Sequence, residues 1–122
     1  VIPSMRTPKN TILFAKEFFG ENHTVIEQVD KKAYLSALAL SEFIVVTCDS
    51  SSMISEAALT GKPIYVANIL PKRKDKRFQK FRKLFKDLNI IKNLDDNHEN
   101  WSYEILDETN RVAKIIKKSL NI

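Results

Sequence analysis

The fold is decided by residues 43–67, which read FIVVTCDSSSMISEAALTGKPIYVA. The stretch begins with an apolar, β-branched run from Phe43 to Thr47, which is typical of a strand buried on both faces. A polar loop from Cys48 to Ser52 leads into a short helix from Met53 to Leu59. The run from Pro63 to Ala67 then predicts a second strand. Because the connections are short, the pattern indicates parallel strands joined by a crossover helix.

The flanking sequence continues this alternation of helices and strands. Helices are expected from Pro8 to Gly20 (with Thr7 as the N-cap), from Lys31 to Leu40, from Asp75 to Asn89 and from Trp101 to Leu120, and short strands at Val1-Ile2, Val25-Ile26 and Ile90-Ile91. We therefore predict an α/β protein with a three-layer αβα, Rossmann-like parallel sheet. Its strands are expected at Val1-Ile2, Val25-Ile26, Phe43 to Thr47 and Ile64 to Ala67.

Composition excludes several classes of function. The 122 residues carry a single cysteine, Cys48, which rules out an internal disulfide and a cysteine-cluster zinc site. The only glycines are Gly20 and Gly61, too few for a dinucleotide-binding or Walker loop. No apolar run exceeds four residues, so we expect no transmembrane helix or signal peptide and a cytoplasmic protein. His23 and His98 lie in separate loops, so no metal site is expected.

The loop Asp49-Ser50-Ser51-Ser52 is the best candidate for a binding site. A serine-rich turn from a strand into a helix aims free backbone N–H groups and the positive end of the helix dipole at one point, which suits a diphosphate. Glu56, one turn into the helix, could accept hydrogen bonds from a ribose diol. The alternative is purely structural, an Asp or Ser cap completed by a nearby Glu. The residues alone leave both interpretations open.

A second polar loop is expected at the same edge of the sheet. Arg6, between Ser4 and Thr7, follows the first predicted strand and could hold a phosphate through two hydrogen bonds. Its alternative is a solvated surface arginine.

Two motifs carry a resemblance to a known family. Residues 49–57 read Asp-Ser-x-Ser-Met-x-x-Glu-Ala and are followed by Thr60-Gly61-Lys62-Pro63, within the stretch from Tyr34 to Val66. With the earlier Ser4-Met5-Arg6-Thr7-Pro8, this resembles the mitochondrial fission Elm-type family, whose bacterial members are labelled nucleoside-diphosphate-sugar epimerases. Met5 replaces the first arginine of the family's Ser-Arg-Arg-Thr-Pro, and Lys32-Ala33-Tyr34 stands for its Asn-Pro-Tyr. The motifs cover about the first 70 residues.

This resemblance implies a GT-B-like architecture of two Rossmann-like domains, with residues 1–122 as the C-terminal one and residues 101–122 as its last helix. In GT-B glycosyltransferases that domain binds the nucleotide-sugar donor. By position, Ser4, Arg6, Thr7, Asp49, Ser50, Ser51 and Ser52 would then meet the diphosphate and Glu56 the ribose.

Catalytic residues and a cofactor are not identified by this resemblance. The chain would work with a missing N-terminal domain, and we expect it to lack transferase or epimerase activity alone. Because Val1-Ile2 looks like the end of a strand, the chain is expected to be a fragment whose open sheet edge favours self-association. The function that the resemblance implies is nucleotide-diphosphate-sugar binding. The alternative is a non-catalytic protein-interaction domain of a fission-type protein, peripheral to a membrane.

The segment from Lys72 to Lys86 carries nine basic residues and one acidic residue, Asp75. Its phenylalanines recur every three to four residues, which predicts an amphipathic helix with a solvated basic face. The sharper interpretation is contact with anionic lipid or a polyanionic acceptor. No nucleic-acid-binding motif accompanies these charges.

Overall fold

The computed structural model of the chain describes residues 1–70, 74–95 and 99–122. Of the predicted basic segment, Lys72 and Arg73 lie outside the described residues, as does His98. The chain divides into two compact units, Val1–Ser41 and Glu42–Ile122, and each is described by itself.

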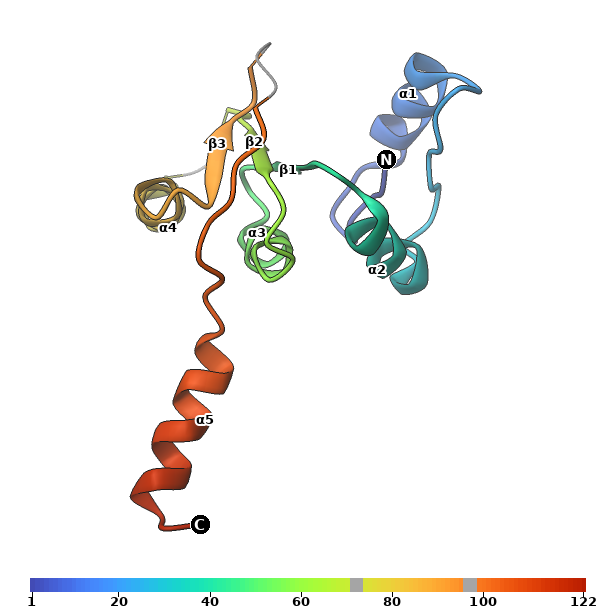
Figure 1. Cartoon of the computed structure of the whole chain (residues 1–122). Coiled ribbons are helices and arrows are strands. Elements are labelled where there is room, and N and C mark those ends of the chain that lie inside the picture. The colour runs from blue at the N-terminus through green and yellow to red at the C-terminus, as the bar shows by residue number, and fades with distance from the viewer. Residues whose placement is uncertain (71–73, 96–98) are drawn as a thin grey trace. The chain divides into compact units, whose positions relative to one another are not determined.

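The second unit contains a parallel sheet of three strands (Figure 1), in the order β1-β2-β3. Its strands are β1 (Ile44–Thr47), β2 (Ile64–Ala67) and β3 (Ile91–Asn93). Ile44 pairs with Ile64, which in turn pairs with Ile91, so the three strands start in step. The predicted α/β class is confirmed, and so is the parallel arrangement of the two strands predicted at Phe43 to Thr47 and Ile64 to Ala67.

The core of this unit lies between the sheet and two helices, α3 (Ser51–Ala58) and α4 (Lys76–Asp87). Side chains alternate along β1, so Ile44 and Val46 are buried whereas Val45 is 55% exposed. The expected burial of this strand on both faces is therefore wrong. Helix α3 contacts β1 and β2, and α4 contacts α3 and β3, but these contacts leave Val45 exposed.

The opposite face of the sheet is covered at Tyr65 by an extended segment that follows β3. The ring of Trp101 meets Tyr65 edge-on at 5.2 Å between centroids, and the Tyr65 hydroxyl bonds to the backbone of Glu99. Farther along, the Tyr103 hydroxyl donates to the carbonyl of Lys62 at 2.7 Å. These contacts hold residues 99–105 extended, so the predicted helix does not begin at Trp101. Helix α5 (Glu108–Ser119) begins after the cap residue Asp107 instead.

The first unit holds two helices, α1 (Lys9–Phe19) and α2 (Lys31–Leu40). Gly20 ends α1 with a φ of 63°, as its position predicts, and the Asp30 carboxylate caps α2 by accepting from the N–H of Ala33. Thr7 does not cap α1, because its hydroxyl accepts from the N–H of Ser4 and Pro8 occupies the cap position.

The expected strands Val1-Ile2 and Val25-Ile26 are not strands of the sheet. These short apolar segments bond to each other: the N–H of Ile26 donates to the carbonyl of Val1, and the Val1 ammonium donates to the carbonyl of Thr24. Each segment offers only two apolar residues, and the backbone hydrogen bonds of the two segments are made with each other. Both segments belong to the first unit, whereas the sheet belongs to the second.

Candidate functional site

An open groove of about 540 Å³ lies beside the start of α3. Its walls come from the first turns of α3 and from the facing side of α4, two helices that both follow strands of the parallel sheet. The residues that line it are Ser51, Ser52, Ser55, Glu56, Arg77, Phe78 and Phe81. The groove therefore combines hydroxyl groups, one carboxylate, one guanidinium and two aromatic rings.

The local sequence explains how the first wall forms. After β1 the chain turns tightly, and the N–H of Ser50 donates to the carbonyl of Thr47 at 3.1 Å. The first bond of the helix runs from the N–H of Ile54 to the carbonyl of Ser50 at 3.0 Å. The N–H groups of Ser51 and Ser52 belong to the first turn of α3, and N–H groups in a first turn have no acceptor within their own helix. In the described part of the chain, no backbone carbonyl outside the helix accepts from them.

The groove brings together three of the predicted site residues, Ser51, Ser52 and Glu56. Ser50 is only 8% exposed and Asp49 is exposed, and neither lines the groove. Among the described residues, the Ser50 side chain makes no capping hydrogen bond. The expected four-residue loop is thus shorter, because Ser51 and Ser52 are already helical.

Sequence reasoning missed Arg77 as a site residue and treated it as one charge on a solvated basic face. A signal was present, because α4 follows β2 as α3 follows β1. In a parallel sheet the starts of such helices lie at the same edge. Phe78 and Phe81, expected to dock the helix on the core, also line the groove.

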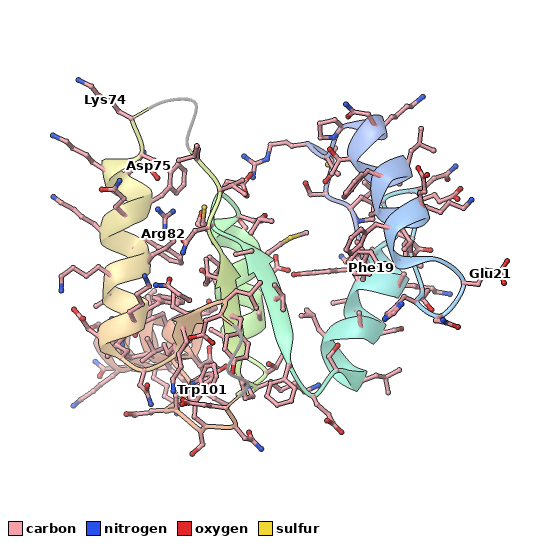
Figure 2. The ribbon with its side chains drawn as sticks, turned by 90° about the horizontal axis from the view of Figure 1, so that it is seen from above. Phe19, Glu21, Lys74, Asp75, Arg82 and Trp101 are labelled. Carbon is pink, nitrogen blue, oxygen red and sulfur yellow. The ribbon has the colours of Figure 1, made fainter. Side chains whose placement is uncertain are left out.

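A partly buried ion pair fixes α4 against the turn that carries the site. Arg82 and Asp75 lie 3.0 Å apart, with side chains only 13% and 17% exposed. The same guanidinium donates to the carbonyl of Cys48 at 2.8 Å, just after β1. Figure 2 shows Arg82 reaching from α4 toward the sheet, whereas Lys74 extends away from it. Arg82 thus links both walls of the groove through one side chain.

The second predicted loop lies in the first unit. The Ser4 and Thr7 hydroxyls are 3.2 Å apart, and the N–H of Arg6 donates to the Ser4 hydroxyl at 3.3 Å. These hydroxyls therefore stabilise their own turn, while Arg6 is exposed. The association of Arg6 with the serine turn of the second unit stays a prediction.

The groups in the groove favour an anionic ligand. Helix-start amides and serine hydroxyls donate hydrogen bonds, and Arg77 adds a positive charge. Glu56 supplies an acceptor for hydroxyl groups, and the rings of Phe78 and Phe81 offer apolar surface. Cys48 is buried. Within residues 1–70, 74–95 and 99–122, no cluster of metal-ligating side chains occurs, and no helix is long and apolar enough to cross a bilayer.

Comparison with known proteins places the chain in a family. The family model described as Mitochondrial fission ELM1 matches residues 1–120. The chain is 30% identical over 122 residues to the Mitochondrial fission protein ELM1 of Arabidopsis thaliana, and this match covers 96% of the chain and 28% of that protein. It is 35% identical over 92 residues to an uncharacterized protein of Rickettsia prowazekii (strain Madrid E), covering 73% of the chain and 26% of that protein.

The chain thus spans about a quarter of the length of these relatives. No solved structure matches it, so the GT-B architecture stays a prediction. The match over nearly all of its residues confirms the resemblance seen in residues 34–66, and the chain belongs to the mitochondrial fission ELM1 family.

Proposed function

We propose that this chain is a protein-interaction domain of a mitochondrial-fission-type protein, one that holds a protein partner. The observation that carries the proposal is the match to a protein named for mitochondrial fission, which extends over 96% of the chain at 30% identity. Because the chain spans about a quarter of that relative, its role is that of one domain in a longer protein.

The surface of α1 supports this proposal. Leu13, Phe14 and Phe18 are all exposed, and the rings of Phe14 and Phe18 stack at 5.7 Å between centroids. Exposed aromatic pairs of this kind are typical of protein-binding surfaces, because burying them in a complex removes apolar area from water. The partner that fits such a face is a protein with an apolar groove.

A second candidate function is the binding of a nucleoside diphosphate or its sugar derivative in the groove. The specific observation in its favour is the clustering of Ser51, Ser52 and Glu56 with Arg77. In this proposal the diphosphate lies at the start of α3 beside Arg77, and Glu56 bonds to the ribose diol. Phe78 would pack against an apolar part of the ligand.

Calorimetric titration of the full-length protein with UDP, GDP, ADP and UDP-glucose separates the two candidates. The interaction proposal expects no saturable binding of any of them. The interaction proposal is overturned, and nucleotide binding in the groove is favoured, if the unaltered protein binds one of them saturably and Arg77→Gln binds it about tenfold or more weakly. That magnitude is expected because one charge-assisted hydrogen bond contributes roughly 1.5–3 kcal/mol.

Lys80→Gln is the matched control for that titration, because it removes one charge from the same helix at a residue outside the groove. If Lys80→Gln weakens binding as much as Arg77→Gln, the effect comes from the general field of α4, and the groove is not the site. Glu56→Gln tests the sugar contact: it should change the preference for ribose over deoxyribose nucleotides only if the carboxylate meets the diol.

A further inference from the structure

Helix α5 carries an apolar stripe that the other described residues of its own unit leave exposed. Val112, Ile115, Ile116 and Leu120 recur at helical spacing, and their exposed fractions run from 44% to 61%. At 100° per residue, these four positions fall within an arc of about 140°. The stripe thus forms one continuous face of the helix.

The remaining face of α5 is strongly basic. Arg111, Lys114, Lys117 and Lys118 occupy an arc of about 120° opposite the stripe. The helix contains one acidic residue, Glu108, which pairs with Arg111, so its net charge is +3. The two faces meet without mixing, because the polar residues between Asn110 and Lys118 all lie on the basic side.

We propose that α5 lies along an anionic lipid surface, with its apolar stripe inserted between the head groups. Charge complementarity selects this occupant. A second copy of α5 would bring one basic face near another, whereas an anionic bilayer supplies negative charge and an apolar interior together. The Lys117 and Lys118 side chains are long enough to reach phosphates while the stripe stays inserted.

Helix α4 is also basic, but its geometry does not suit insertion. Phe81 and Phe85 contact each other at 4.4 Å between centroids and are half-buried against the rest of their unit. The side of α4 that faces away from them carries Lys76, Lys80 and Lys83. This helix can therefore add attraction to an anionic surface, but α5 supplies the inserted apolar face.

The test is co-flotation of the full-length protein with two kinds of vesicle, phosphatidylcholine alone and phosphatidylcholine containing phosphatidylserine. We expect binding to the second kind only. The double variant Lys117→Gln, Lys118→Gln should bind about tenfold or more weakly, since each cation near an anionic surface contributes about fivefold. The variant Ile115→Gln, Ile116→Gln should lose binding to a similar extent or more, because it removes the insertion.

A matched double variant on α4, Lys80→Gln with Lys86→Gln, removes the same charge elsewhere. The proposal is overturned if this variant loses as much binding as the α5 variants, because charge alone would then explain the effect. The proposal is also overturned if the unaltered protein does not bind the anionic vesicles. In that case an acidic protein becomes the partner expected to cover the apolar stripe of α5. Unchanged circular dichroism confirms folding of the variants. The proposal does not involve the groove, so it stands or fails separately from the nucleotide titration.

Discussion

The ion pair between Asp75 and Arg82 gives the sharpest prediction for stability. Replacing Arg82 by Met keeps an unbranched side chain but removes the charge, so the Asp75 carboxylate and the Cys48 carbonyl each lose a bond. Asp75 keeps its bond from Gln79 at 2.8 Å. Removing one partner of a buried pair costs about 3–5 kcal/mol. Because these side chains are 13% and 17% exposed, we expect a loss of about 2–3 kcal/mol.

The assay is urea denaturation followed by circular dichroism, with Lys83→Met as the matched control. Lys83 lies one position along the same helix and pairs with Asp87 at 2.9 Å, but these side chains are 76% and 62% exposed. Its loss should cost less than about 1 kcal/mol. A double variant, Asp75→Leu with Arg82→Met, should recover part of the stability, because no unpaired carboxylate remains. Equal losses for Arg82→Met and Lys83→Met would show that the Asp75–Arg82 pair stabilises the fold no more than an exposed pair does.

Three further predictions concern other contacts of the chain. Trp101→Ala should lower the free energy of unfolding by about 2 kcal/mol or more, because the Trp101 ring packs on Tyr65 and its N–H donates to the carbonyl of Asn89. Urea denaturation measures this loss, and a loss below about 0.5 kcal/mol would contradict the prediction. Burial raises the pKa of Tyr103 above its ordinary value of 10.0, and a hydrogen bond with a threonine opposes this only in part. The neutral phenol is then favoured in the folded state, so stability should fall above about pH 10, and Tyr103→Phe should lose less stability between pH 9 and pH 11 than the unaltered chain. Gly61→Ala should lower the melting temperature more than Gly20→Ala does. Both glycines have φ above 60°, but a Cβ added at Gly61 would lie 3.2 Å from the Ile105 side chain, whereas a Cβ added at Gly20 would have no atom within 4 Å.

Local patterns were enough to predict the centre of the second unit. The apolar run of β1, the serine turn and the glycine at residue 61 act over a few residues each, and the structure contains the strand, helix and strand that they indicate. The same stretch placed Ser51, Ser52 and Glu56, which line the groove.

Contacts between distant residues were beyond such patterns. The composition of residues 101–107 is compatible with a helix, but the bonds of Trp101 to Asn89 and of Tyr103 to Lys62 hold them extended. The order of strands and helices places the start of α4 near that of α3, but only the packing of the two helices brings Arg77 into the groove. At the other end of the chain, Val1-Ile2 and Val25-Ile26 are apolar enough for strands, but their backbone groups bond to each other.

The proposed function is tested most directly in Arabidopsis plants that lack the related fission protein. The plants would express that protein with its matching segment replaced by this chain, either unaltered or with Arg77→Gln and Glu56→Gln in the groove, or with Phe14→Ser and Phe18→Ser on α1. The measured quantity is mitochondrial length. If the chain acts through a protein partner on α1, the unaltered and groove-altered proteins restore normal length equally, whereas the α1 variant does not. Restoration by the α1 variant together with failure of the groove variant would contradict it.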